Sequence, residues 1–215
     1  MYRIFLKRFL DIIFSIVIMP FFLIVLLIIG PIIFLEDKGK IFYNAARLGK
    51  NGKVFKMYKF RSMKENSKDI RNEDGSTYNG EDDPRVTKIG KILRKTSIDE
   101  LPQIINVLKG DMSFIGPRPD LPEHMKMYKR KQKRKLEVRP GITGYNQAYY
   151  RNSVDWKTRI KNDIFYIDNI SFWLDIKVLF KTLSTVFKHE GVYINIPEIE
   201  AKQTIKEENK EYARK

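Results

Sequence analysis

One uninterrupted apolar segment constrains the fold of this chain more than any other feature. Residues 9–35 read FLDIIFSIVIMPFFLIVLLIIGPIIFL, in which Asp11 is the single charged side chain. A segment of this length can cross the hydrocarbon core of a bilayer as a helix. No small-residue cleavage site follows it, so we do not expect a removed signal peptide. We therefore expect a membrane-embedded helix within residues 1–36 and a separate domain after it.

Basic residues flank the apolar segment on both sides. They are Arg3, Lys7 and Arg8 before it and Lys38, Lys40, Arg47, Lys50 and Lys53 after it. Because positively charged flanks are retained in the cytoplasm, a straight span cannot satisfy both ends. Pro20 lies near the middle, where it removes a backbone hydrogen bond and is expected to break the helix. These features favour a re-entrant helix–break–helix that enters and leaves the same leaflet, and the alternative is a single-pass anchor.

Composition narrows the classes of partner and of metal site. The 215 residues allow one domain, and a formal net charge of +15 implies an anionic partner: a nucleic acid, an anionic lipid or a phosphorylated substrate. The chain has no cysteine, which excludes disulfides and thiolate metal sites. The two histidines, His124 and His189, lie far apart in the sequence, so we do not expect a histidine-based metal site.

The stretch 94–119, RKTSIDELPQIINVLKGDMSFIGPRP, combines a helical pattern with two adjacent carboxylates. Apolar residues recur at helical spacing, and Gly110 predicts the helix end. Asp99 and Glu100 stand at the predicted helix start among basic residues, an arrangement that suits phosphoryl chemistry. The ordinary alternative is a capping box formed by Ser97 and Glu100, with the N-cap between Ser97 and Asp99.

This stretch resembles the signature of the bacterial sugar transferases, the monotopic phosphoglycosyl transferases. The similarity extends over the hydrophobic N-terminus, YKFRSM at 58–63, DPRVTKIGKILRKTSIDELPQ at 83–103, GDMSFIGPRP at 110–119 and RPGITGYNQ at 139–147. Several blocks in the right order are more specific than any single motif. Enzymes of this family transfer a phospho-sugar from a nucleotide diphosphate sugar to polyprenyl phosphate in the membrane, with magnesium.

The resemblance implies a role for each matching residue. Asp99 would attack the sugar-proximal phosphorus of a UDP-sugar and expel UMP, and polyprenyl (undecaprenyl) phosphate would then attack the aspartyl phospho-sugar. Glu100 would support metal or proton handling, which makes Asp99 and Glu100 the implied Mg²⁺ ligands. Lys59, Arg94 and Arg118 would bind the substrate phosphates.

Residues 41–63 predict a β-hairpin, because Asn51-Gly52 separates two strand-like segments. Lys56, Lys59 and Arg61 follow one another along the second strand, and we expect them to form one cationic face. An ordinary solvated face is the alternative. A short helix is expected over residues 86–93, where apolar side chains form one stripe and basic side chains another.

Two further helices are predicted near the C-terminus. Trp156, Ile160, Ile164 and Ile167 share one helical face, whereas Asp163 and Tyr166 are expected to point elsewhere. Asp163 matches a family position near the active site, which implies substrate binding, and a solvated helix acid is the alternative. Residues 172–187 predict an amphipathic helix that is either part of the core or interfacial.

The polar segments complete the prediction. Residues 64–83 indicate a mobile loop, and residues 198–215 a disordered tail. The basic run at 124–135 lies in no recognised nucleic-acid motif, so we expect it to attract anionic lipid rather than nucleic acid.

The sequence thus predicts an α-dominant α+β protein with an N-terminal re-entrant membrane helix, interfacial amphipathic helices and a small β-hairpin. Its parts are the membrane helix at 1–36, a cytoplasmic or interfacial catalytic domain at 37–197 and the tail. We expect it on the cytoplasmic face of the bacterial inner (plasma) membrane, where phosphoglycosyl transfer would initiate glycoconjugate biosynthesis with a UDP-sugar, polyprenyl phosphate and Mg²⁺. Two alternatives remain: a non-enzymatic membrane-surface scaffold, and an ordinary glycosyl transferase that leaves both phosphates on the nucleotide.

Overall fold

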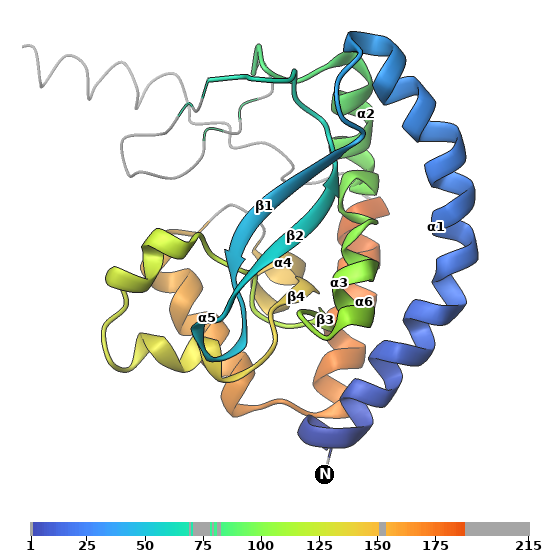
Figure 1. Ribbon diagram of the computed structural model, residues 1–215. Helices are drawn as coiled ribbons and strands as arrows, with labels where there is room; N and C mark the ends of the chain where they lie inside the picture. The colour runs from blue at the N-terminus through green and yellow to red at the C-terminus, as the bar shows by residue number, and fades with distance from the viewer. Residues whose placement is uncertain are drawn as a thin grey trace, which may run out of the picture. The chain divides into compact units, whose positions relative to one another are not determined.

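The computed structural model describes residues 2–68, 70, 78, 80, 83–150 and 154–187 (Figure 1). Contacts divide the chain into two units, and the helices and strands of the described residues lie in the first unit, residues 1–68 and 84–192. The second unit comprises residues 69–83 and 193–215. Most of the predicted loop at 64–83, and the whole predicted tail at 198–215, lie outside the described residues.

The first unit is α-dominant with a small hairpin, as predicted, and it contains a second two-stranded sheet that was not predicted. Its regular elements are α1 (Lys7–Asp37), β1 (Phe42–Leu48), β2 (Val54–Phe60), α2 (Lys88–Thr96), α3 (Gln103–Lys109), β3 (Ser113–Ile115), β4 (Gly141–Thr143), α4 (Tyr145–Tyr149), α5 (Trp156–Asp168) and α6 (Phe172–Phe187). A short π-helical turn, Tyr2–Leu6, precedes α1. Four 3₁₀ segments complete the unit: Lys50–Gly52, Ile98–Glu100, Pro122–Lys126 and Gln132–Glu137.

The apolar segment forms the single long helix α1, and the predicted break at Pro20 is wrong. The helix runs through Pro20 and Pro31 without interruption for 31 residues, and it curves along its length (Figure 1). A proline removes one donor and crowds one carbonyl, and a gentle curve accommodates both while the neighbouring backbone bonds hold. The packing of Phe22 and Ile33, each 2% exposed, also fixes one side of the helix against the domain.

The opposite side of α1 presents apolar side chains to the surroundings. Those more than half exposed are Phe9, Ile16, Val17, Phe21, Ile24, Leu27, Ile28 and Leu35. This helix is long and apolar enough to cross a membrane. A continuous exposed apolar surface of this extent is typical of a membrane contact and not of a protein surface in water.

Polar contacts join both ends of α1 to the same domain. Near the N-terminal end, the Asp11 carboxylate accepts hydrogen bonds from Ser113 Oγ and Phe114 N, each at 3.0 Å. At the C-terminal end, both guanidinium nitrogens of Arg61 donate to the carboxylate of Asp37. Paired, charge-assisted bonds of this kind fix orientation as well as distance. The two ends of the helix therefore contact one domain, and the expected entry and exit on one side of the membrane stays a prediction.

The hairpin prediction is confirmed. Strands β1 and β2 pair antiparallel from Phe42↔Phe60 to Leu48↔Val54, and a 3₁₀ turn connects them. Asn51 and Gly52 both have positive φ, 57° and 75°, which explains the Asn-Gly sequence at this turn.

The predicted single cationic face of this hairpin is wrong. Lys56 is exposed, Lys59 reaches the acidic pair described below, and Arg61 follows the strand and contacts Asp37. Lys59 follows Lys56 by three positions, an odd offset, so the twofold period of a strand places the two side chains on opposite faces.

The main core lies between α1, β2, α2 and α3. Its buried members are Phe22, Ile33, Phe60, Leu93 and Ile104. Thr87 caps α2 by accepting a hydrogen bond from Gly90 N, and Gly110 ends α3 with φ +86° as predicted. This core holds the end of α2, the turn after it and the start of α3 against strand β2.

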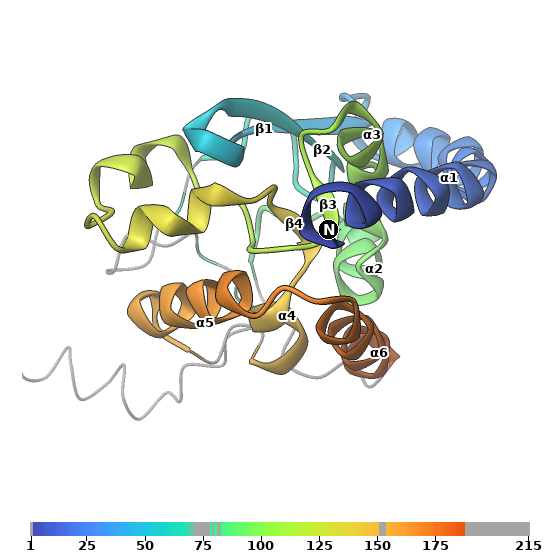
Figure 2. The same cartoon turned by 90° about the horizontal axis from the view of Figure 1, so that it is seen from below.

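The second part of the unit is built on the parallel pair β3–β4, with Ser113 opposite Gly141 and Ile115 opposite Thr143. Figure 2 shows this pair between the hairpin on one side and α5 and α6 on the other. Both predicted C-terminal helices are present. Asp163 and Tyr166 of α5, 2% and 1% exposed, face the interior with Ile160 and Ile167, so the expected outward orientation is wrong.

Helix α6 has one buried and one exposed apolar side. Val178 is fully buried, whereas Trp173, Phe180 and Leu183 are 71%, 65% and 46% exposed. One side of α6 thus contributes to the core. The other side presents Trp and Phe, which are typical of a membrane interface, and the interfacial placement of this helix stays a prediction.

Candidate active site

Asp99 and Glu100 lie on the 3₁₀ turn Ile98–Glu100, between the C-terminus of α2 and the start of α3. Ser97 has a left-handed backbone conformation, with φ 58°, and its side chain makes no capping bond, so the alternative of a capping box formed by Ser97 and Glu100 is wrong. The regular helix begins only at Gln103, after Pro102. Proline has no N–H to donate and is best tolerated before or in the first turn, which explains this delayed start.

Lys59 and Arg118 contact this acidic pair from two other parts of the chain. Lys59 Nζ lies 2.5 Å from Glu100 Oε1 and 3.9 Å from Asp99 Oδ2. Arg118 Nη1, from the segment after β3, lies 3.3 Å from the same Glu100 oxygen. The structure therefore brings together four of the predicted site residues, although Lys59 and Arg118 are 59 positions apart in the sequence.

The two carboxylates have pKa values shifted in opposite directions. Burial raises the pKa of Asp99, and the negative charge of Glu100 raises it further, against the opposing effect of Lys59. Burial acts in the same sense on Glu100, but the charges of Lys59 and Arg118 outweigh it and lower its pKa to about 2. Glu100 thus carries the fixed negative charge that holds both cations, and Asp99 is the more basic of the two carboxylates.

Arg94 reaches the same region from the last turn of α2. Its Nε donates to Ser62 Oγ at 3.0 Å, and its charge lowers the pKa of Asp99. Gly90 allows α2 to pack this closely, because a Cβ at that position would lie 2.0 Å from the Ser62 carbonyl oxygen. Sequence reasoning missed Ser62 as a positioning residue, although it belongs to the YKFRSM segment that carries Lys59.

The structure does not bring Asp163 into contact with the acidic pair. Its carboxylate lies 2.9 Å from Lys135 Nζ and accepts a hydrogen bond from Asn146 Nδ2 at 3.0 Å. Lys135, with its side chain 3% exposed, also contacts Asp120 at 2.6 Å. These contacts form a buried ion-pair cluster between α5 and the 3₁₀ segment Gln132–Glu137. The expected role of Asp163 in substrate binding stays a prediction.

The acidic pair fits Mg²⁺ as a partial set of ligands. Asp99 and Glu100 supply hard oxygen donors, and Oε1 of Glu100 is already engaged by Lys59 and Arg118. Among the described residues there is no group of three or more acidic, histidine or cysteine side chains that could hold a metal ion by themselves. Mg²⁺ is commonly bound by one or two carboxylates together with substrate phosphates, so a donor set of this size suits a metal shared with a phosphorylated substrate.

The arrangement as a whole is suited to phosphoryl transfer. Asp99 is a buried carboxylate, and Lys59 lies closer to its neighbour Glu100 than to Asp99 itself. A carboxylate of this kind can act as a nucleophile toward phosphorus. The cations Lys59, Arg94 and Arg118 lie around it, where they can bind phosphate oxygens and stabilise charge during transfer.

Comparison with known proteins agrees with this chemistry. Residues 2–189 match the profile described as bacterial sugar transferase. The chain is 41% identical over 187 residues to an uncharacterized sugar transferase, EpsL, of Bacillus subtilis, covering 87% of this chain and 90% of that protein. It is also 41% identical over 206 residues to an undecaprenyl-phosphate galactose phosphotransferase of Salmonella typhimurium, covering 88% of this chain and 42% of the relative.

A third relative is named UDP-N-acetylgalactosamine-undecaprenyl-phosphate N-acetylgalactosaminephosphotransferase, from Aeromonas hydrophila. Identity is 40% over 193 residues, covering 87% of this chain and 45% of the relative. The chain thus spans less than half the length of these last two proteins and nearly the whole length of EpsL. With a profile match over most of its length and relatives near 40% identity, the chain belongs to the bacterial sugar transferase family.

Proposed function

We propose that this protein transfers a sugar 1-phosphate from a UDP-sugar to polyprenyl phosphate through a covalent intermediate on Asp99. The observation that carries the proposal is the placement of Asp99: it is 9% exposed, has a raised pKa, and lies beside cations that are held by Glu100. The names of the relatives from Salmonella and Aeromonas, both undecaprenyl-phosphate sugar phosphotransferases, support the same reaction class.

The first step forms the intermediate and releases the nucleotide. A carboxylate oxygen of Asp99 attacks the sugar-proximal phosphorus of the UDP-sugar, an Asp O–P bond forms, and the bond to the bridging oxygen breaks. The electron pair leaves with that oxygen as UMP. Glu100 keeps Lys59 and Arg118 beside the reacting phosphate, and the raised basicity of Asp99 favours its attack.

The second step transfers the phospho-sugar to the lipid. A phosphate oxygen of polyprenyl phosphate attacks the same phosphorus, and the Asp99 carboxylate leaves and is regenerated. Lys59, Arg94 and Arg118 hold the phosphate charge in both steps. Mg²⁺ bound to Asp99, Glu100 and the substrate would neutralise pyrophosphate charge, which the two hard carboxylate donors fit.

The location of the reaction follows from helix α1. The acceptor is a membrane lipid, and α1 presents an exposed apolar surface while both of its ends contact the domain that carries Asp99. We place this domain on the cytoplasmic face of the inner membrane, because the flanks of α1 are basic and UDP-sugars are cytoplasmic metabolites.

Product analysis tests the proposal. Purified protein incubated with Mg²⁺ and either UDP-galactose or UDP-N-acetylgalactosamine, without acceptor, is expected to release UMP in an amount close to that of the enzyme. Mass spectrometry of the quenched protein is expected to find a phospho-sugar on the peptide that contains Asp99. Adding polyprenyl phosphate should discharge the adduct and permit repeated turnover. Release of UDP would instead indicate glycosyl transfer, and release of neither nucleotide would indicate a scaffold.

A further inference from the structure

A cationic cavity lies at the N-terminal end of α1, outside the acidic pair and its cations. It has a volume of about 260 Å³ and is partly open to the surroundings. Its charged lining consists of five cations, Arg3, Lys7, Arg8, Lys50 and Arg139, and two acids, Asp11 and Glu137. The cations therefore outnumber the acids, and the ion pairs within the lining decide which cations are left for a ligand.

Two of the cations and both acids have partners. Arg3 pairs with Glu137 at 3.5 Å, and Lys7 bonds to Asp175 of α6. The carboxylate oxygen Oδ1 of Asp11 accepts from Ser113 Oγ and Phe114 N, as described above. Glu137 and Asp175 are thus each paired with a cation, whereas Asp11 is bonded to neutral donors and its charge acts on Lys7 and Arg8. The contacts join the start of α1 to β3, to α6 and to the 3₁₀ segment Gln132–Glu137.

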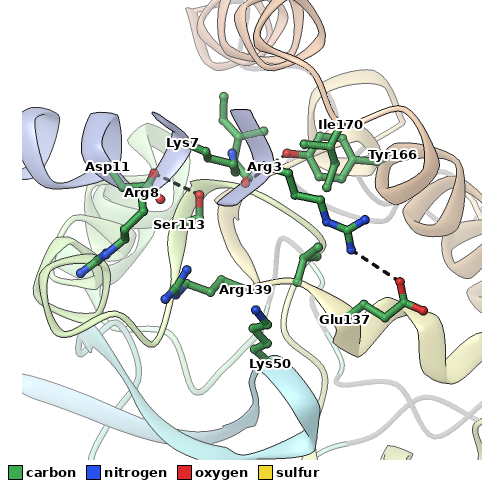
Figure 3. Close-up of a pocket in the computed structure, with 12 residues that line it drawn as sticks. Arg3, Lys7, Arg8, Asp11, Lys50, Ser113, Glu137, Arg139, Tyr166 and Ile170 are labelled. Atoms are coloured by element: carbon green, nitrogen blue, oxygen red, sulfur yellow. Dashed lines mark hydrogen bonds and ion pairs between the residues drawn. The ribbon is translucent and has the colours of Figure 1, made fainter. Parts of the chain in front are cut away.

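The remaining three cations have no ion pair with a carboxylate among the described residues. Arg8 donates to the carbonyl oxygens of Val107 and Leu108, the latter at 3.0 Å, and Arg139 Nε donates to that of Gly110 at 2.8 Å. The C-terminus of α3 therefore holds two guanidinium groups beside each other, since exposed helix carbonyls attract cations. Figure 3 shows Lys50 extending from the hairpin turn toward Arg139.

This cluster is separate from the proposed catalytic centre. The acidic pair precedes the N-terminus of α3, whereas Arg8 and Arg139 bind its C-terminus. A helix of seven residues is about 10 Å long, which places the cavity a full helix length from Asp99. A phosphate bound in the cavity would be too distant to react at Asp99.

The surroundings of the cavity are those of a membrane surface. Phe5 and Phe9, at the start of the chain, are 71% and 60% exposed, and Trp173 of α6 is 71% exposed. Tyr2 packs edge-on against Phe172 next to them, with ring centroids 6.0 Å apart. Aromatic residues beside basic ones are characteristic of the headgroup level of a bilayer, with the apolar side chains directed toward lipid tails.

We propose that Arg8, Lys50 and Arg139 form a binding site for the headgroup phosphate of an anionic phospholipid, distinct from the substrate phosphate site. Three cations without an ion pair, in a cavity whose lining has five cations and two acids, match a phosphate group in charge and size. The exposed aromatic side chains beside the cavity are placed to contact the acyl chains of the same molecule. A choline headgroup would bring its own positive charge against the cluster, so the site should discriminate against phosphatidylcholine.

The test uses Lys50, which is exposed in the hairpin turn and forms no described side-chain bond, with Lys53 as a matched control. Both lysines lie at the same turn, but Lys53 does not line the cavity. Full-length protein in detergent is titrated with dioleoyl phosphatidylglycerol or phosphatidylcholine, and bound lipid is counted by native mass spectrometry without substrates. We expect Lys50→Glu to weaken phosphatidylglycerol binding by at least about tenfold, Lys50→Gln by less, and Lys53→Glu hardly at all.

Several results would overturn the proposal. Equal losses in Lys50→Glu and Lys53→Glu would indicate general attraction to a basic protein. Equal binding of phosphatidylcholine would show that the cluster does not select anionic headgroups. Displacement of phosphatidylglycerol by millimolar inorganic phosphate would identify a site for a soluble anion. The lipid-binding assay needs no turnover, so a negative result in it would not contradict the proposed transferase reaction. Likewise, absence of transferase activity would not contradict lipid binding at this site.

Discussion

Lys59 lies much closer to Glu100 than to Asp99: its ammonium is 2.5 Å from Glu100 Oε1 and 3.9 Å from Asp99 Oδ2. The glutamate therefore holds the cation, and the aspartate keeps a carboxylate that is available for attack. This division of roles between adjacent acids gives each residue of the site its own expected response to substitution.

Asp99→Asn separates a catalytic role from a structural one. The amide is isosteric but cannot form an acyl phosphate, so we expect UMP release to be abolished. The free energy of unfolding should change by no more than about 1 kcal/mol, because the Asp99 side chain caps no helix here. Turnover and thermal unfolding of the membrane-bound protein measure the two effects. A well-folded Asp99→Asn protein with substantial activity would exclude the covalent mechanism.

Lys59→Met removes the cation shared by the two acids. We expect a large loss of turnover and a loss of about 2 kcal/mol in the free energy of unfolding, because a charged hydrogen bond to Glu100 disappears. Lys56→Met is the control, since Lys56 lies on the same strand and is exposed. Equal effects of the two substitutions on kcat/KM would indicate that Lys59 only stabilises the strand and has no role in the reaction.

Arg118→Ala tests the second cation. We expect the activation free energy of the transfer reaction to rise by about 2–4 kcal/mol, as when an enzyme loses one hydrogen-bond donor to the charge that develops in the transition state. Arg118→Lys should restore little, because an ammonium cannot form the two parallel bonds of a guanidinium. Arg134→Ala serves as control: its side chain is 42% exposed, against 45% for Arg118, and pairs with Asp168 and Glu137 instead. Near-native turnover of Arg118→Ala at saturating substrate would place Arg118 outside the reaction.

Lys135→Met is expected to destabilise the fold in a pH-dependent way. Lys135 forms ion pairs with the buried carboxylates of both Asp120 and Asp163. Its charge lowers the pKa of Asp120 against the effect of burial. Without Lys135, two buried acids remain unpaired, and we expect a loss of about 3–5 kcal/mol at pH 7.

The pH dependence of this loss has a definite sign. A carboxyl group whose folded pKa is lowered stabilises the fold above its unfolded pKa, and this contribution disappears as the pH falls through the folded pKa. In Lys135→Met, protonation relieves the unpaired acids, so the difference from the wild type should narrow toward pH 4. Denaturant unfolding at several pH values measures it, with Lys133→Met as the exposed control. A difference that is independent of pH would mean that packing, and not charge, explains the loss.

The topology of α1 can be tested in this cysteine-free chain. Arg3→Cys and Lys40→Cys place one thiol beyond each end of the helix, at exposed positions. Because both helix ends contact the same domain, we expect a membrane-impermeant maleimide to label both thiols in inverted membrane vesicles and neither in intact cells. Labelling of the two from opposite sides would establish a single-pass span.

Local pattern in the sequence was enough to predict most helices, the hairpin and the acidic pair. The bounds of α6 match the predicted range 172–187, because a one-sided apolar period of 3.6 residues is visible without any partner. The hairpin turn and the end of α3 follow from residues that tolerate positive φ, Asn51-Gly52 and Gly110. The resemblance in turn pointed to Asp99, Glu100, Lys59 and Arg118, which the structure brings together.

Only the tertiary structure decided what depends on residues distant in the sequence. Helix α1 continues through Pro20 because its neighbouring turns and its packing against the domain outweigh one lost backbone bond. Asp163 faces inward because Lys135, 28 positions earlier, supplies its charge partner. The opposite pKa shifts of Asp99 and Glu100 likewise arise from burial and from cations brought by other elements. Adjacent carboxylates look equivalent in a sequence, and only their different distances to Lys59 make one a counter-ion and leave the other free to react.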